Sequence, residues 1–479
     1  MNTKLERAQL ALNQATNQRG NAFYPNFHLA PPAGWMNDPN GLIYHQGVYH
    51  AFYQHHPFSE NWGPMHWGHA TSKDMVRWQH QPVALAPGEE FDRDGCFSGS
   101  AVDDNGTLSL IYTGHVWLNG EGNDSAIREV QCLATSQDGI HFTKQGVVLT
   151  PPENIMHFRD PKVWQEDGHW WMVVGARDAS DCGQVLLYKG TSLRDWTFDR
   201  VLAKADAGDG YMWECPDFFP LGDENILMCS PQGIRTQGHD YQNLFQSGYL
   251  RGHWQPGHHF EITQGFVELD HGHDFYAPQS FTAADGRRII IAWMDMWESV
   301  MPSKEEGWAG CLTLPREMTL RDGKVRMMPA EEVCTLRQEH RPLTPCVLKN
   351  SVQQLSENAQ ATEIILQWDL SHSDAERFGI TLGDGLCLFV DKQTQRLFLN
   401  RDYAAYRIQD SRSVALPESN HLELRVFIDR SSVEVFVNQG EKTFSSRIYP
   451  QPDKRALSLF AEKGQAMLSQ GDSWALRTE

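Results

Sequence analysis

The sequence predicts an all-β protein that consists of a five-bladed β-propeller followed by a C-terminal β-sandwich. Three observations lead to this prediction. Five similar units follow one another along the chain, a short turn motif recurs inside them, and beyond residue 346 the pattern changes to pairs of alternating apolar strands. Repeated units that each contain several short strands are typical of propeller blades.

The five units start at Asp38, Ser98, Asp160, Glu214 and Tyr276, at intervals of 60, 62, 54 and 62 residues. Each unit has a turn cluster between two runs rich in Val, Ile, Tyr, Phe and Trp, without the 3.6-residue apolar stripe of a helix. Units of this length accommodate four short strands. We therefore expect five four-stranded blades rather than helical repeats.

A second repeat supports the same register. The segments ATSKDMVRW (residues 70–78) and ATSQDGIHF (residues 134–142) lie 64 residues apart, and GTSLRDWTF (residues 190–198) is a weaker third copy. A motif that returns at the blade interval is expected to occupy the same place in each blade.

The ends of the chain complete the domain plan. A capping box at Thr3 and Glu6 and a stop at Gly20 predict a short N-terminal helix. Alternating apolar residues in the segment 422–428 give a strand one apolar face, as in a sandwich. The predicted domains are a helix over 1–20, the propeller over 21–328, a linker over 329–346 and the sandwich over 347–479.

Composition limits the possible partners. The net charge is −20 and no Lys/Arg cluster is present, which argues against nucleic acid and anionic membranes and favours a small-molecule substrate. The first 20 residues lack the apolar core of a signal peptide, and no apolar run is long enough to span a membrane. Nine cysteines without a CxxC pair are typical of reduced thiols. We expect a cytoplasmic protein without a metal ion or cofactor; its oligomeric state stays open.

Three carboxylates are predicted to meet at the centre of the propeller. The first strand of a blade lines the central channel, so Asp38, Asp160 and Glu214 would converge although they are far apart in sequence. The structural alternatives are that Asp38 only shapes the Asn-Asp-Pro turn and that Arg159 and Asp160 are a surface charge pair. Stability alone does not favour a gathering of like charges, so a catalytic role is the preferred interpretation.

Glycoside hydrolysis needs such carboxyl groups in different roles. Asp38, on a tight turn ahead of Pro39 and beside donors that keep it ionised, fits the nucleophile. Glu214 fits the acid/base, because Trp213 and Phe218 are expected to give it an apolar setting that favours the protonated form. Asp160 is expected to stay charged and hold sugar hydroxyls as the ring distorts.

The ordered motifs resemble glycoside hydrolase family 32, the invertases and fructan hydrolases. The resemblance extends from about residue 20 to the end of the chain. Its motifs are WMNDPNG (35–41), FSGS (97–100), FRDPKV (158–163), WECPDFF (213–219), GHDFYAPQSF (272–281), WAGCLTLPREM (308–318) and DRSSVEVFVN (429–438).

The resemblance implies a retaining mechanism on β-fructofuranosides with the same roles for the three carboxylates. It also implies a fructose pocket of six further residues, although Trp62 on its own would more often belong to a core. One departure is His56, where many relatives have Asn before the proline. The implied pocket residues are Asn37, Gln54, Trp62, Phe97, Ser98 and Arg159.

Sucrose is the preferred substrate, because a cytoplasmic location favours a small imported saccharide over a polymer. Sucrose 6-phosphate is the alternative within the class, with Lys304 as a candidate phosphate contact or simply an exposed loop residue. A sugar-binding propeller without catalysis is an alternative from another class. An inverting glycosidase is a further one, with carboxyl groups about 6.5–9.5 Å apart rather than about 5–5.5 Å.

Overall fold

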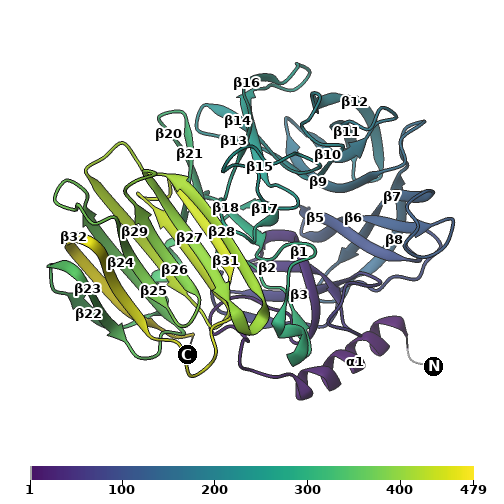
Figure 1. Cartoon of the computed structure of the whole chain (residues 1–479). Helices are drawn as coiled ribbons and strands as arrows, with labels where there is room; N and C mark the ends of the chain where they lie inside the picture. The colour runs from purple at the N-terminus through teal and green to yellow at the C-terminus, as the bar shows by residue number, and fades with distance from the viewer. Residues whose placement is uncertain (1–2, 479) are drawn as a thin grey trace.

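The computed structural model describes residues 3–478 and contains two β-rich domains packed side by side (Figure 1). Five sheets are arranged around a central axis, and the sandwich lies against one side of this ring. This arrangement confirms the predicted five-bladed propeller with a C-terminal β-sandwich.

The first two blades are continuous meanders in sequence order. Blade 1 contains β1 (Gly34–His45), β2 (Val48–His56), β3 (His66–Ser72) and β4 (Trp78–His80). Blade 2 contains β5 (Gly95–Asp104), β6 (Thr107–Trp117), β7 (Ile127–Ser136) and β8 (Thr143–Leu149).

The next two blades repeat this order. Blade 3 contains β9 (Phe158–Glu166), β10 (His169–Arg177), β11 (Gly183–Ser192) and β12 (Asp195–Lys204). Blade 4 contains β13 (Met212–Leu221), β14 (Glu224–Gln232), β15 (Gly248–His253) and β16 (Glu261–Glu268).

Blade 5 is interrupted by a segment that closes the ring. Within this segment, β19 (Trp308–Ala309) pairs in parallel with the start of β1, in blade 1. The last blade of the ring is therefore tied to the first by backbone hydrogen bonds, which protects an otherwise open edge. Blade 5 contains β17 (Tyr276–Thr282), β18 (Arg288–Trp293), β20 (Arg316–Arg321) and β21 (Lys324–Pro329).

Each blade has a β-bulge near the start of its first strand, where the pairing with the second strand shifts register. The bulge aims side chains at the axis. Asp160, Cys215 and Ala277 adopt positive φ there, at 67°, 48° and 50°. The residues that follow the bulge positions surround a small cavity on the axis: Pro39, Gly99, Pro161, Pro216 and Pro278.

The bulges correct the predicted blade register. The residue directly before Pro39, Gly99, Pro161, Pro216 or Pro278 has the same structural position in each blade. Cys215 and Ala277 therefore occupy in blades 4 and 5 the position that Asp38 and Asp160 hold in blades 1 and 3. Glu214 is therefore one position earlier, equivalent to Arg159. The sequence numbering of units from Glu214 and Tyr276 was offset by one residue, because neither Cys215 nor Ala277 carries a charge that marks the position.

The repeated ATS motif forms the turn between the third and fourth strands of a blade. In blade 1, Ser72 donates a hydrogen bond to Asp74, which accepts the backbone N–H groups of Val76 and Arg77. Asp138 in blade 2 makes the corresponding turn with Ser136. These side chains replace backbone partners in a tight turn, which explains the recurrence.

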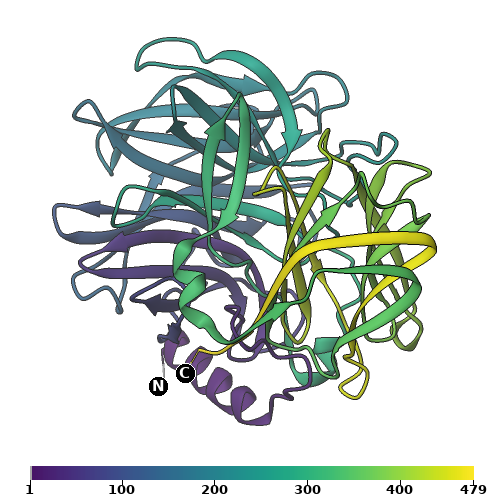
Figure 2. The same cartoon turned by 90° about the vertical axis from the view of Figure 1, so that its left-hand side faces the viewer.

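The C-terminal domain has two layers that share one strand. The 20-residue strand β32 (Leu457–Leu476) pairs with β25 along its first part and with β24 along its last part. Figure 2 shows it as the long curved yellow strand. The other strands are β22 (Arg337–Leu343), β23 (Cys346–Ser356), β24 (Thr362–Asp369), β25 (Arg377–Leu382), β26 (Leu386–Asp391), β27 (Arg396–Tyr403), β28 (Ile408–Ala415), β29 (His421–Ile428), β30 (Ser432–Val437) and β31 (Lys442–Arg447).

The range predicted as a linker has regular structure of its own. It begins after β21 with a short 3-10 helix, Glu331–Leu336, and continues as β22, which pairs with β32. At the other end of the chain, α1 (Lys4–Gln18) has the predicted capping box: Glu6 N–H donates to Thr3 Oγ1, and Thr3 N–H donates to Glu6 Oε2. Residues 1 and 2 of the predicted helix lie outside the described residues.

A buried charged group joins the propeller, the segment before β1 and the sandwich. We call His28, Asp270, Arg316, Asp429 and Glu434 the junction cluster. His28 bridges the two sandwich carboxylates, 2.8 Å from Asp429 and 2.5 Å from Glu434. Arg316 contacts Glu434 at 2.7 Å and Asp270 at 3.1 Å. All five side chains are at most 1% exposed.

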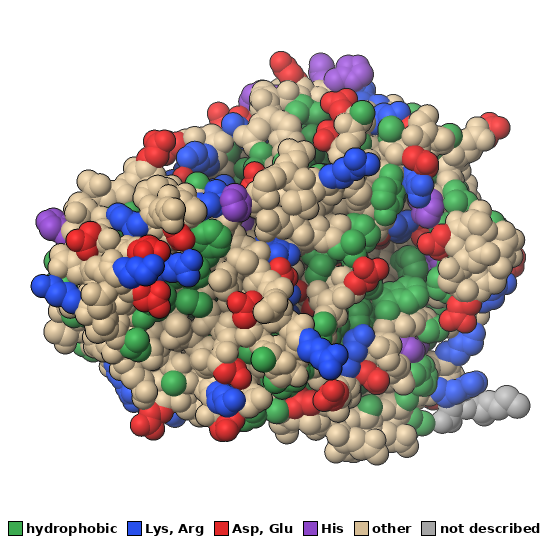
Figure 3. Space-filling view, in the orientation of Figure 1, with side chains coloured by type: hydrophobic (Ala, Val, Ile, Leu, Met, Phe, Trp, Pro, Cys, Tyr) green, Lys and Arg blue, Asp and Glu red, His purple; other side chains and the backbone are tan. Residues whose placement is uncertain are grey.

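Among the described residues, no helix is both long and apolar enough to cross a membrane. On the face drawn in Figure 3, acidic and basic side chains are interspersed rather than gathered in one basic patch.

Candidate active site

A pocket of about 780 Å³ is formed around the propeller axis, where the first strands of the blades start. The structure places all nine sequence-predicted site residues on its wall. They are Asn37, Asp38, Gln54, Trp62, Phe97, Ser98, Arg159, Asp160 and Glu214. A pocket of this size suits a small ligand such as a disaccharide.

Asp38 is held by donors from two blades. Asn37 Nδ2 donates to its Oδ1 at 3.0 Å, and Ser98 Oγ donates to its Oδ2 at 2.6 Å. The orientation of the Asn37 amide is fixed because Trp35 Nε1 donates to Asn37 Oδ1 at 2.7 Å. Asp38 as a whole residue is 9% exposed. It is therefore fixed in one position but open to the pocket.

Asp160 is connected to the neighbouring blades on both sides. Its backbone N–H donates to Thr113 Oγ1 of blade 2 at 3.0 Å, and its Oδ2 accepts the Cys215 N–H of blade 4 at 2.9 Å. Cys215 Sγ also lies 3.5 Å from Asp160 Oδ2 and 3.5 Å from Asp38 Oδ2. This thiol thus lies between the two aspartates.

Glu214 has a polar setting, and the prediction of an apolar one is wrong. Arg159 donates to Glu214 Oε1 from Nε at 3.1 Å and from Nη2 at 2.8 Å. The Tyr276 hydroxyl donates to Oε2 at 2.5 Å. Trp213 and Phe218, which were expected to surround it, instead pack with the apolar core formed by blades 3 and 4.

Arg159 has a second partner that the sequence analysis missed. Glu129 on β7 accepts from Arg159 Nη1 at 3.1 Å, and His115 on β6 lies 3.0 Å from its other oxygen. Burial raises the pKa of Glu129, but Arg159 and His115 outweigh it and lower that pKa to about 2. No local motif marks Glu129 or His115, because both come from interior strands of another blade.

The electrostatics of the two aspartates differ from the sequence-based expectation. Burial, followed by the charge of Glu214, raises the pKa of Asp38 to about 6, against the hydrogen bonds of Ser98 and Asn37. Burial and Glu214 also raise the pKa of Asp160 well above its usual range, although Arg159 opposes this. Asp160 was expected to stay charged; its pKa is raised because burial and the charges of Glu214 and Asp38 outweigh the opposing charge of Arg159.

The pocket wall combines aromatic and amide groups. Phe97 stacks on His115 with ring centroids 4.2 Å apart, and Trp62, 36% exposed, lies at 6.2 Å from Phe97. Trp62 is thus a wall residue rather than part of a core. Gln54 Nε2 donates to Asn40 Oδ1 and to the Cys96 carbonyl. These two hydrogen bonds fix the orientation of the Gln54 amide.

Two other residues singled out in the sequence are not on the pocket wall. His56 Nδ1 is engaged with the Asn61 carbonyl at 2.8 Å. Lys304 Nζ donates to Asn61 Oδ1 at 3.0 Å and lies 5.3 Å above the Trp35 ring. Tyr276 was used only to number the repeats, and its contact with Glu214 makes it a site residue that the sequence analysis missed.

Comparison with known proteins agrees with this geometry. Residues 28–329 match the glycosyl hydrolases family 32 N-terminal domain, and residues 332–475 match the family 32 C-terminal domain. The chain belongs to glycosyl hydrolase family 32. It is therefore a glycoside hydrolase, and the resemblance of its ordered motifs to this family is confirmed.

Similar family 32 proteins match along almost the whole chain. A sucrose-6-phosphate hydrolase of Escherichia coli is 64% identical, with 99% of each chain covered. A raffinose invertase of Escherichia coli is 63% identical, over 99% of this chain and 100% of the relative. The structure of a Bombyx mori GH32 beta-fructofuranosidase is 36% identical with a TM-score of 0.87, over 98% of this chain and 97% of that one.

Proposed function

We propose that this family 32 enzyme hydrolyses sucrose to glucose and fructose with retention of configuration, through a fructosyl-enzyme intermediate on Asp38. The convergence of Asp38, Asp160 and Glu214 on one pocket is the observation that carries the proposal. A variant of the similar Bombyx mori beta-fructofuranosidase, 35% identical to this chain with a TM-score of 0.87, has been solved in complex with sucrose.

The mechanism has two displacements at the anomeric carbon. First, Asp38 attacks this carbon while its bond to the glucose oxygen breaks, and Glu214 gives its proton to that oxygen. Glucose leaves as a neutral alcohol. Then Glu214 takes a proton from a water molecule, which displaces Asp38 and releases fructose. Two inversions give net retention.

The contacts of the pocket support this division of roles. The charge of Glu214 is one of the causes that raise the pKa of Asp38. A proton on Glu214 removes this repulsion, so the state with a protonated acid is also the state in which Asp38 is ionised and ready to attack. The donors Asn37 and Ser98 hold Asp38 in position during the attack.

Asp160 is proposed to bind hydroxyls of the fructosyl ring in the transition state. Its Oδ2 accepts the Cys215 N–H, whereas among the described residues no hydrogen bond reaches its Oδ1. This oxygen is available to a sugar hydroxyl. Hydrogen bonds of this kind strengthen as the ring becomes oxocarbenium-like and therefore accelerate the chemical step.

The charges of the pocket favour sucrose over sucrose 6-phosphate. Seven acidic side chains but only two arginines are among the described residues that line it. Both arginines are already paired, Arg159 with Glu129 and Glu214, and Arg177 with Asp181 at 2.7 Å. A phosphate dianion would meet net repulsion there. The name of the E. coli relative keeps sucrose 6-phosphate as the second candidate substrate.

We place the enzyme in the cytoplasm. All nine cysteines are free thiols in the structure, and three of them, Cys96, Cys132 and Cys229, are completely buried. Free thiols are typical of proteins from a reducing compartment.

Two measurements on purified protein test the proposal. Proton NMR of the first-formed fructose is expected to show the β-furanose anomer, and kcat/KM is expected to be higher for sucrose than for sucrose 6-phosphate. The α anomer would indicate an inverting mechanism. A higher kcat/KM for sucrose 6-phosphate would make the phosphorylated sugar the preferred substrate. An absence of glucose release would indicate a sugar-binding protein without catalysis.

The variant Glu214→Ala separates the acid/base from the nucleophile. We expect its kcat on sucrose to fall about 10³-fold, because an unprotonated sugar alkoxide leaves poorly. An aryl fructoside needs less protonation, so its cleavage should be impaired far less. Azide should then accelerate turnover and give a β-fructosyl azide. Equal losses on both substrates, without azide rescue, would move the acid/base role to another residue.

A further inference from the structure

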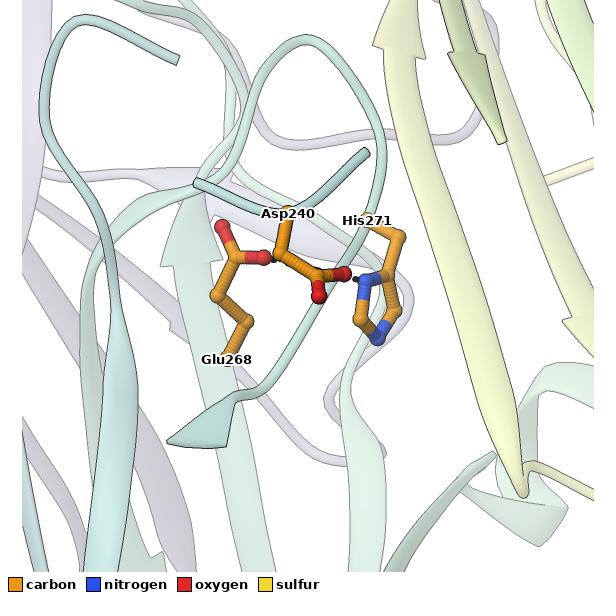
Figure 4. Close-up of side chains that lie close together, drawn as sticks. All are labelled: Asp240, Glu268 and His271. Atoms are coloured by element: carbon orange, nitrogen blue, oxygen red, sulfur yellow. Dashed lines mark ion pairs between the residues drawn. The ribbon is translucent and has the colours of Figure 1, made fainter. Parts of the chain in front are cut away.

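A second cluster of potential ligands lies in blade 4, near the sandwich (Figure 4). Asp240 belongs to the loop between β14 and β15, Glu268 ends β16, and His271 precedes β17. One ligand atom from each of the three lies within 4.8 Å of the others. The sequence gives no sign of this group, because its first two members are 28 residues apart.

The imidazole of His271 points into this group without a hydrogen bond. Its side chain is only 10% exposed, and Nδ1 faces Glu268 Oε2 at 3.9 Å, which is too long for a hydrogen bond. No other hydrogen bond to this ring is found among the described residues. The His271 side chain is nine-tenths buried and its ring is directed at two carboxylates without a hydrogen bond to either, and a cation between them would supply the partner.

We propose that Asp240, Glu268 and His271 bind one Zn²⁺ ion. One imidazole nitrogen and two carboxylate oxygens are a common three-residue zinc set, with water in the fourth position. Tetrahedral ligands at about 2.0–2.1 Å from zinc lie about 3.3 Å apart. The ligand atoms, which lie within 4.8 Å of one another, would therefore move closer together, and the 3.9 Å separation between His271 and Glu268 would shorten by about 0.6 Å. The exposed side of Asp240 admits the water.

Basic side chains of the sandwich limit the affinity that we expect for zinc. Lys442 and Arg396 act electrostatically on His271. Arg396 is engaged by Ser413 Oγ at 2.8 Å and the Ser413 carbonyl at 3.1 Å. Their positive charge opposes a dication, so we expect micromolar rather than nanomolar binding.

The ion would tie together three parts of the molecule. The β14–β15 loop, residues 233–247, carries Asp240 and also Phe245, which lines the active-site pocket. His271 N–H donates to the Thr443 carbonyl of the sandwich at 2.8 Å, and Glu268 belongs to blade 4. Zinc is therefore proposed to fasten the loop to the junction of the propeller and the sandwich.

Zinc binding can be measured by equilibrium dialysis of EDTA-treated protein against ZnCl₂, with metal analysis. At micromolar zinc, we expect wild-type protein to bind one zinc ion per chain more than the variants Asp240→Asn and His271→Ala bind. The matched control is His253→Ala, an exposed histidine of the same blade. This control should bind as much zinc as wild type, because other surface histidines contribute equally to all samples.

Trypsin digestion gives a second readout, because Arg235 lies exposed in the loop. Zinc should slow cleavage after Arg235 at least 5-fold in wild type and in His253→Ala, but not in Asp240→Asn. Because Asp240 is exposed, its substitution removes a ligand without disturbing the buried residues. Equal zinc stoichiometry in wild type and Asp240→Asn, or equal protection of Arg235, would overturn the proposal. Neither result depends on activity toward sucrose.

Discussion

The active site and the junction cluster each gather three carboxylates, but their electrostatic balance is opposite. In the active site, Arg159 pairs with Glu214 and Glu129, while burial and the charge of Glu214 raise the pKa of Asp38 to about 6. In the junction cluster, burial raises the pKa of Glu434 but Arg316 and His28 outweigh it and lower that pKa to about 2.

The difference shows what each group contributes. Paired charges at the junction hold the two domains together, and removal of one partner would leave a buried charge uncompensated. The unbalanced charges of the pocket reduce stability, and the proposed mechanism explains their presence, because attack and proton transfer require carboxyl groups in different protonation states.

The largest expected effect is on activity. Asp38→Asn should lower kcat/KM for sucrose by at least about 10⁴-fold, because an amide cannot act as the nucleophile. The same change should raise the free energy of unfolding at pH 7 by about 1–3 kcal/mol, because the pKa of Asp38 is raised by folding. Sucrose assays and urea unfolding measure both. Retained activity, or a loss of stability, would contradict the contrast between the two regions.

The converse result is expected at the junction. Arg316→Met should lower the free energy of unfolding by about 3–5 kcal/mol, because Glu434 and Asp270 lose their buried partner. Activity per folded molecule should change little. The matched control is Arg321→Met in the same strand, β20, whose exposed side chain should contribute less than about 0.5 kcal/mol. Equal effects of the two substitutions would show that the junction cluster is not a stabilising unit.

The junction cluster also predicts a dependence of stability on alkaline pH. Burial lowers the pKa of His28, but hydrogen bonds to Asp429 and Glu434 outweigh it and raise that pKa to about 9. The folded protein thus holds this proton more tightly than the unfolded chain, whose histidine pKa is about 6.5. The contribution is complete below pH 6.5 and is lost as pH rises to about 9, up to about 3 kcal/mol.

Urea unfolding at pH 6, 7.5 and 9 measures this loss. His28→Gln, which cannot titrate, should be less stable than wild type at pH 6 and should lose most of the difference by pH 9. A stability difference that does not change with pH would assign the alkaline titration to another group.

The smallest expected effect is at the mouth of the pocket. Trp62 is 36% exposed and lies beside Phe97 and Trp117. Trp62→Ala should raise KM about 3- to 10-fold with little change in kcat, because an apolar wall contributes to ground-state and transition-state binding alike. Stability should stay within about 0.5 kcal/mol of wild type. A fall in kcat without a change in KM would place Trp62 closer to the reacting atoms.

The sequence predicts the propeller because local turn chemistry recurs in each blade, and it predicts Asp38, Asp160 and Glu214 because they stand beside those turns. Glu129 and His115 could not be predicted in this way. They act on Arg159 from interior strands of a neighbouring blade, where nothing in the local pattern separates a functional side chain from a core one. The protonation behaviour of Asp160 also depends on total burial, which a motif does not express.

The shared strand β32 has a consequence for the order in which the chain is made. It pairs with β22, β23, β24 and β25, so until Leu457–Leu476 has been synthesised β22 and β23 have no partner strand, and β24 and β25 each have one open edge. A ribosome that stops before residue 457 would release a complete propeller beside open strand edges, which are sites of aggregation. The unfinished sandwich is therefore the part of the growing chain most exposed to edge-to-edge aggregation.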